Sequence, residues 1–159
     1  MERSSMRKRW IACVVAVALA LGAWAVRGDD GSGADSLRQQ ILDAIRGGAR
    51  YAVTVLLDST GKSRCDYNLL TGSWEEYEPA WHTGQLIFGL TRAFEVTGDS
   101  SLLRAACRAG DWWVSLQITD HPVLKGMVRA IHGAGIPYIV FATVSDGTAG
   151  LFRLYRLTG

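Results

Sequence analysis

The sequence WEEYEPAWHTGQLIFGLTRAFEVTGD (residues 74–99), continued by SSLLRAACRAGDWWVSLQ (residues 100–117), decides the fold. Its first half predicts a helix over about 83–97, because the apolar positions recur at helical spacing on one face: Leu86, Ile87, Leu90 and Phe94. Gly98 suits the left-handed residue that follows a helix, and Asp99 or one of the next serines can cap a second helix. The stretch therefore predicts an antiparallel helical hairpin with a tight joint.

The second helix of this hairpin has a predicted inner face of small and apolar residues: Leu103, Ala106, Gly110, Trp113 and Val114. Acidic and aromatic residues gather at the two ends of the hairpin. We expect any chemistry at those ends.

The rest of the chain adds two more helices. One is predicted from Asp35 or Ser36 to about Leu56, with a buried side made of Leu37, Ile41, Ala44, Ile45, Tyr51 and Val55. Residues 62–78 predict a long loop with one short extended piece. Residues 118–147 predict an ordered loop, although 136–144 has the composition of a strand, and a final helix is expected from about Thr148.

The N-terminus has the pattern of an export signal. Residues 1–9 contain four basic side chains, and residues 10–26 form an uncharged run of 17 residues. This predicts a signal peptide or N-terminal membrane anchor over 1–27, with a linker over 28–34. A buried core helix is the less favoured reading, because the run has no polar face. We therefore expect a periplasmic, extracellular or outward-facing membrane-anchored protein, with the membrane contacted through residues 10–26 if they are not cleaved.

The charge of the chain is concentrated in that segment. Residues 1–25 hold four of the 17 Lys and Arg but only one of the 15 acidic residues, so the remainder is slightly acidic. No basic stripe suggests nucleic acid. Cys65 and Cys107 could form one disulfide in an oxidising compartment, although Cys107 fits better as a small core residue.

An internal repeat is the most informative feature. GLTRAFEVTG (89–98) matches GLFRLYRLTG (150–159) with an offset of 61, and AIRGG (44–48) matches ACRAG (106–110) with an offset of 62. Chance likeness between amphipathic helices is the alternative. Repeats bury their core only by stacking on neighbours. We therefore expect either an N-terminal piece of a longer protein or a short chain that assembles with another copy or subunit.

Three stretches resemble the six-hairpin glycosidase superfamily: WHTGQLIFGLTRAFEVTGD (81–99), AACRAGDWW (105–113) and DGTAGLF (146–152). Its members are (α/α)6 barrels and include unsaturated glucuronyl hydrolases, N-acylglucosamine 2-epimerase-like proteins and glucuronyl C5-epimerases. The resemblance covers about 36–159 and implies an all-α, incomplete (α/α)6 toroid over 35–159. It also implies sugar-binding loops around 66–82 and 120–146. A closed toroid needs six hairpins, and this chain supplies about two.

The catalytic candidates are acidic residues and one histidine. Glycoside chemistry needs two carboxyl groups on one bond, which makes Glu76 and Glu78 candidates beside aromatic residues. A solvated acidic loop is the alternative reading. His82 could act as an acid or base or hold the loop in place. Asp146 is expected to cap the final helix, at a place that points toward the sugar end of a toroid.

The binding candidates are aromatic and polar residues near those positions: Trp74, Trp81, Trp112, Glu75 and His132. Aromatic faces stack on sugar rings, whereas Trp113 is expected in the core. The three His residues have no paired ligand spacing, and no phosphate-binding or nucleophile motif is found. We therefore expect no metal and no cofactor.

These patterns predict a carbohydrate-active protein, either a glycoside hydrolase or an epimerase acting on uronic-acid or related glycans. The alternative is a non-catalytic helical-hairpin protein that binds a glycan or assembles with another subunit.

Overall fold

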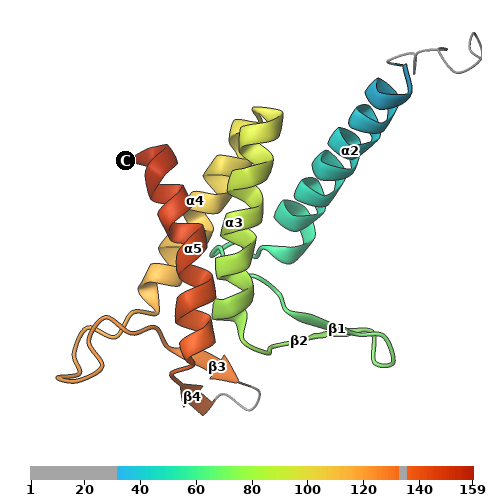
Figure 1. Ribbon diagram of the computed structural model, residues 1–159. Coiled ribbons are helices and arrows are strands. Elements are labelled where there is room, and N and C mark those ends of the chain that lie inside the picture. The colour runs from blue at the N-terminus through green and yellow to red at the C-terminus, as the bar shows by residue number, and fades with distance from the viewer. Residues whose placement is uncertain (1–31, 133–135) are drawn as a thin grey trace, which may run out of the picture. The chain divides into compact units, whose positions relative to one another are not determined.

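The computed structural model describes residues 32–132 and 136–159. Its elements are α2 (Ser32–Tyr51), a π-helical turn η1 (Ala52–Leu56), β1 (Asp66–Asn68), β2 (Ser73–Glu75), α3 (Pro79–Thr97), α4 (Ser100–Ser115), β3 (Ala130–His132), β4 (Ile136–Tyr138) and α5 (Phe141–Thr158) (Figure 1). The described chain is mostly helical, as predicted. Two small antiparallel sheets, β1–β2 and β3–β4, depart from the all-α expectation.

The chain divides into a unit that ends at Gln40 and a unit from Ile41 to Gly159. Helix α2 begins in the first unit and ends in the second, which holds all the later elements. The predicted linker over 28–34 is wrong at its end, because Ser32 already begins α2. The apolar run 10–26 lies outside the described residues. In the ranges that are described, no helix is both long and apolar enough to span a bilayer.

The joint between α3 and α4 confirms the predicted hairpin. Gly98 has a φ of 72°, and its N–H donates to Phe94 O at 2.8 Å. Asp99 Oδ1 then accepts from the Ser101 N–H at 2.9 Å and caps α4. Helix α3 begins four residues earlier than predicted, since Pro79 at its first position needs no hydrogen-bond acceptor for an N–H.

The core lies between α3 and α4 and includes Ile87 and Leu90, both predicted. The buried face of α4 is rotated from the predicted one and consists of Leu102, Ala105, Ala106, Ala109, Gly110 and Trp113. Leu103 is therefore only half-buried, and the predicted inner residue Val114 is exposed. Trp113 is buried, as predicted, and its Nε1–H donates to Ala80 O at 3.0 Å.

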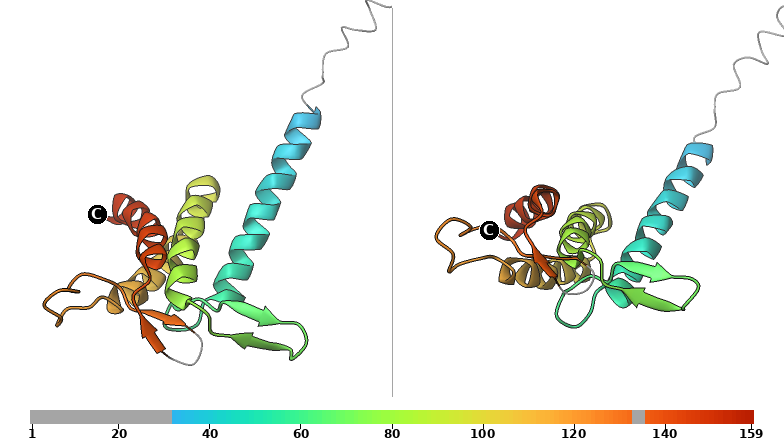
Figure 2. Two further views of the ribbon diagram at one scale, coloured as in Figure 1. Left: turned by 60° about the horizontal axis from the view of Figure 1, so that its bottom comes forward. Right: turned by 90° about the horizontal axis from the view of Figure 1, so that it is seen from below.

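Helix α5 packs against α3, and Figures 1 and 2 show the two side by side. A Cβ on Gly84 would overlap Gly147, and a Cβ on Gly150 would overlap Gly84 O. The expectations of a loop through residue 147 and a helix from Thr148 are wrong, because α5 begins at Phe141. Gly84, Gly147 and Gly150 have no side chain, and this permits the close packing of α3 and α5.

The predicted buried side of α2 is largely wrong. Leu37, Ile41 and Tyr51 are 58%, 51% and 51% exposed, whereas Ala49 and Ala52 are buried. Apolar spacing identifies one face of a helix, but it does not say whether another element covers that face. Only the end of α2 and the turn after it contribute to the core.

The structure places the repeat on corresponding elements. Helix α2 corresponds to α4, and α3 corresponds to α5, with one small sheet between the helices of each pair. The matched segments 89–98 and 150–159 form the C-terminal halves of α3 and α5, and both end at a glycine with positive φ. Residues 62–78 therefore hold a complete hairpin rather than a loop with one extended piece.

Candidate functional site

The site is built where α3 and α5 begin, next to the two sheets (Figure 1). Trp81 lies in the first turn of α3, and its Nε1–H donates to Asp146 Oδ2 at 3.0 Å. The His82 ring lies 5.0 Å from the Trp81 ring in an edge-on arrangement. Ser145 Oγ donates to Asp146 Oδ1 at 3.3 Å. The structure thus brings together three residues that the sequence analysis identified as separate candidates, Trp81, His82 and Asp146.

Asp146 does not cap α5, contrary to the prediction. Val140 occupies the capping position, and Asp146 lies in the second turn of the helix. The sequence suggested a cap because Asp146 comes just before the helix predicted from Thr148, but the helix begins earlier, and Gly147 is buried against Trp113 inside it. Asp146 is instead a solvent-accessible carboxylate held by an indole N–H from another helix.

A hollow of about 380 Å³ opens beside this carboxylate and is lined by Asp146, Ala149, Gln85 and Phe88. Gln85 and Phe88 follow Trp81 by one and two helical turns, so helical spacing from Trp81 would have identified them. Phe88 is 44% exposed. The Arg153 guanidinium lies over its ring, 5.4 Å from the centroid. The hollow therefore combines a carboxylate, an amide and an aromatic ring.

The first small sheet carries a separate aromatic pair. Tyr67 and Trp74 are cross-strand partners whose ring centroids lie 5.1 Å apart at 68°. The Arg64 guanidinium lies 5.5 Å from the centre of the Trp74 ring. Trp74 therefore has its own neighbours in the sheet, and no contact joins it to Asp146.

The acidic residues of this segment have different partners. Asn68 Nδ2 donates to Glu75 Oε1 at 2.7 Å, and Lys62 forms an ion pair with Glu76. Both glutamates are exposed. The sequence predicted Glu76 as a catalytic residue and Glu75 as a binding residue, and the two carboxylates contact different side chains.

Glu78 is unlike the other glutamates. It is buried and has a left-handed backbone with φ of 49° immediately before Pro79. A non-glycine residue rarely adopts this conformation, so the entry into α3 is locally strained. Its carbonyl oxygen accepts from the His82 N–H at 3.2 Å, which fixes His82 in the first turn.

The other two predicted binding residues lie elsewhere. Trp112 is half-buried on α4 and packs against the core. His132 is the last residue of β3 and pairs with Ile136 across the sheet, while its side chain is outside the description. Cys65 and Cys107 are free thiols, so the proposed disulfide is absent. Burial raises the pKa of Cys65 above its ordinary value.

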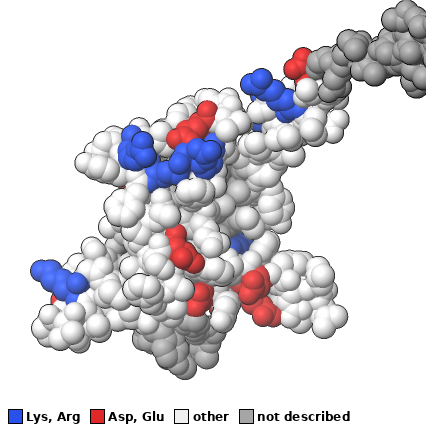
Figure 3. Space-filling view, viewed as in Figure 1, with Lys and Arg blue, Asp and Glu red and all other residues white. Residues whose placement is uncertain are grey.

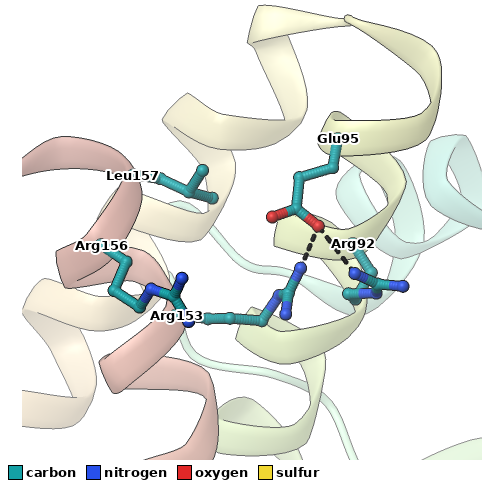
Figure 4. Close-up of a pocket in the computed structure, with 5 residues that line it drawn as sticks. All are labelled: Arg92, Glu95, Arg153, Arg156 and Leu157. Carbon is teal, nitrogen blue, oxygen red and sulfur yellow. Dashed lines mark hydrogen bonds and ion pairs between the residues drawn. The ribbon is translucent and has the colours of Figure 1, made fainter.

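A second hollow, of about 290 Å³, lies toward the other ends of α3 and α5 and was not predicted (Figure 4). Glu95 accepts from Arg92 at 2.9 Å and also pairs with Arg153 of α5. Arg156 and Leu157 complete the lining. Figure 3 shows basic and acidic groups side by side over this end of the helices. The repeat contained the signal, because it relates Arg92 to Arg153 and Glu95 to Arg156.

Within residues 32–132 and 136–159, no group of three His, Cys, Asp or Glu side chains is arranged to hold a metal ion. Comparison of the chain with protein families, curated proteins and solved structures gave no match.

Proposed function

We propose that this chain is a carbohydrate-active protein of the six-hairpin (α/α) type, with its sugar site at the end where α3 and α5 begin. The observation that carries the proposal is the hydrogen bond from Trp81 to Asp146 beside the hollow lined by Gln85 and Phe88. Carboxylates and amides bind sugar hydroxyls through paired hydrogen bonds, and aromatic rings pack on the C–H faces of sugars.

The repeat supports the toroid part of the proposal. Each half has a helix, a short antiparallel sheet and a second helix, and the second helices α3 and α5 lie side by side. The sheets precede these helices, so they border the same end as Asp146. In this reading α3 and α5 are neighbouring inner helices of an incomplete (α/α)6 toroid.

The proposed chemistry is hydrolysis or epimerisation of uronic-acid or related glycans by acidic groups. Asp146 is the first candidate for acid or base, because Trp81 fixes its orientation and leaves the carboxylate accessible. His82 is the second proton-transfer candidate, because its ring lies edge-on to Trp81, the residue that holds Asp146. Glu78 is the third candidate for acid or base, and its carbonyl oxygen accepts from the His82 N–H at the start of α3.

A glycan-binding protein without turnover is the second candidate function. It is favoured by the pairing of Glu75 with Asn68 and of Glu76 with Lys62. Glycoside hydrolysis needs a second carboxyl group across the bond. Neither of these two glutamates is joined to Asp146 by a contact.

The test is turnover and binding of uronic-acid-containing oligosaccharides by the full chain and its Asp146→Asn and Trp81→Phe variants. For an enzyme we expect Asp146→Asn to lower kcat/KM by at least about 100-fold while calorimetric affinity changes little. Trp81→Phe should act in the same direction with a smaller effect, because the carboxylate remains. Asp111→Asn, which changes an exposed carboxylate on α4, is the matched control and should behave as wild type.

The same assay distinguishes an enzyme from a glycan-binding protein without turnover. Binding without turnover in the wild type, weakened by Asp146→Asn, would establish the glycan-binding function. Neither binding nor turnover across the oligosaccharides would refute the carbohydrate proposal. The Glu76→Gln and Glu78→Gln variants then decide whether either residue is catalytic, because a catalytic carboxyl is needed for turnover and dispensable for affinity.

We also propose export, with residues 10–26 as a cleaved signal or an outward-facing anchor. Cell fractionation with intact-mass measurement tests this. Recovery of the uncleaved chain from the soluble cytoplasm would refute it.

A further inference from the structure

The second hollow, between the C-terminal halves of α3 and α5, is lined mainly by guanidinium groups (Figure 4). Arg92 and Glu95 come from α3, and the other lining residues come from α5: Arg153, Arg156 and Leu157. Three guanidinium groups against one carboxylate leave an excess of two positive charges. The carbonyl ends of the two helices offset about half a charge each. The hollow therefore stays positive and favours an anion.

The one carboxylate of this lining is already shared by two arginines. Arg92 Nη1 donates to Glu95 Oε2 at 2.9 Å, and Arg153 Nη2 donates to the same oxygen. Figure 4 shows the two dashed lines meeting at that oxygen. Arg156 makes no ion pair within the described part of the chain. Glu95 therefore cannot neutralise all three guanidinium groups.

Arg153 has donor capacity beyond its bond to Glu95. Its side chain is only 21% exposed, and its Nε is buried without a hydrogen-bond partner among the described residues. A buried N–H without an acceptor costs free energy. Arginine presents its N–H groups as a planar fork, which pairs well with two oxygens of one anion. Arg153 can therefore still donate to an oxyanion in the hollow that it lines.

The repeat shows how the excess of positive charge arises. It relates Arg92 to Arg153 and Glu95 to Arg156. On α3 the base and the acid lie three residues apart and pair with each other. On α5 both positions are arginine, and like charges on neighbouring positions of a helix surface repel each other. An anion near both arginines removes this repulsion, so the basic residue in place of the acid favours a bound anion.

We propose that this hollow binds a phosphate group, held by Arg92, Arg153 and Arg156. A phosphate monoester carries about 1.5 to 2 negative charges at neutral pH and has three strong acceptor oxygens. It can accept from several arginine forks at once, whereas a planar carboxylate matches one fork. The lining that the structure describes has no aromatic ring, so the phosphate and not a ring is recognised.

The size of the hollow limits what can carry the phosphate. Its volume of about 290 Å³ lies near the lower end for small-ligand pockets, on the order of 300 Å³. Free phosphate and the phosphate of a small monoester present the same oxygens, and both fit this volume. The site is separate from the proposed sugar site, because it lies toward the other ends of α3 and α5.

Calorimetric titration of the full chain with inorganic phosphate tests the site, in one mild non-ionic detergent at constant ionic strength. We expect phosphate to bind at least about tenfold more tightly than acetate, because only phosphate matches several forks. Glycerol 3-phosphate is titrated in parallel. Tighter binding than that of inorganic phosphate identifies a monoester as the ligand, and equal or weaker binding identifies the free ion. Binding of neither phosphate compound, or equal affinity for phosphate and acetate, would overturn the proposal.

Arg156→Gln tests the residue assignment. Because Arg156 has no ion pair in the described residues, the variant should keep the wild-type circular dichroism and lose about tenfold in phosphate affinity. Arg156→Lys keeps the charge without the fork and should lose less. Arg108→Gln changes an exposed arginine of α4 outside the lining and should bind phosphate as wild type does. Wild-type affinity in Arg156→Gln, or an equal loss in Arg108→Gln, would refute the assignment.

Glu95→Gln should act in the opposite direction. It removes the only carboxylate of the described lining, so phosphate affinity should rise several-fold even though the α3–α5 ion pair is lost. If these charges only stabilise the helix pair, the variant should be less stable with unchanged phosphate affinity, and that result would contradict the proposal. None of these outcomes bears on the sugar site, which is tested by turnover and affinity for oligosaccharides.

Discussion

Helices α3 and α5 are two versions of one helix, and they differ in what lies against them. Both have Gly-Leu, Arg and Thr-Gly at matching positions, and both end at a glycine with positive φ. Yet Leu90 is buried while its counterpart Leu151 is half-buried, and Gly150 is tightly packed while Gly89 is open. The same local sequence therefore becomes core or surface according to its neighbours, and the pair provides its own internal controls.

The largest effect should come from removing the buried leucine. We expect Leu90→Ala to lower the free energy of unfolding by about 3–5 kcal/mol, since it leaves a cavity between α3 and α4. Leu151→Ala removes the same atoms from a half-buried position and should lower it by roughly 1–2 kcal/mol. Urea unfolding of the full chain measures both, and equal losses would contradict the difference in burial.

The next effect concerns the close helix contact. Gly150→Ala should lower the free energy of unfolding by about 1–3 kcal/mol, because its new Cβ would overlap Gly84 O and press on Ile87. The urea midpoint should fall without a change in the slope of the transition. An unchanged midpoint would mean that α3 and α5 are not held at this spacing.

Gly89→Ala should have the opposite sign. The added methyl group meets no atom within 4 Å, and alanine is the better helix former. We expect the free energy of unfolding to rise by about 0.5–1 kcal/mol. A loss of stability would show that something already occupies the open side of α3.

The smallest effect is electrostatic. Glu95→Gln removes pairs with Arg92 and Arg153 at a partly exposed position and should lower the free energy of unfolding by about 0.5–1 kcal/mol, less at high salt. The counterpart Arg156→Gln should have almost no effect, because Arg156 makes no ion pair within residues 32–132 and 136–159. If Glu95→Gln and Arg156→Gln lower the free energy of unfolding equally, the ion pairs of Glu95 do not stabilise the fold.

The sequence predicted the features that depend on local chemistry. The joint at Gly98 and Asp99 was predicted because glycine and aspartate have conformational and hydrogen-bonding properties that suit those positions. The burial of Ile87, Leu90 and Trp113 followed from helical spacing. The repeat was visible in the residues themselves.

The predictions that were wrong concern features that depend on tertiary contacts. The start of α5 was missed because the residues before Thr148 were assigned to a loop, and the contact of Gly147 with Trp113 that favours a helix there is tertiary. The exposed side of α2 was mistaken for core because spacing does not reveal a missing partner. For the candidate site, Trp81, His82 and Asp146 were named, but Asp146 is 65 residues from Trp81 in sequence, so their contact could not be derived. Gln85 and Phe88 were overlooked because they read only as helix surface.

The position of the β1–β2 sheet has a consequence for how such a protein can change. Its tip at Leu69 and Leu70 is fully exposed, while the sheet joins α3 through the strained residue Glu78. Residues can therefore be inserted at the tip without touching the glycine contacts that set the helix spacing. The β3–β4 sheet has the same place in the order of elements of the second repeat. Each repeat in this sense has one surface whose sequence can change while its helices stay constant.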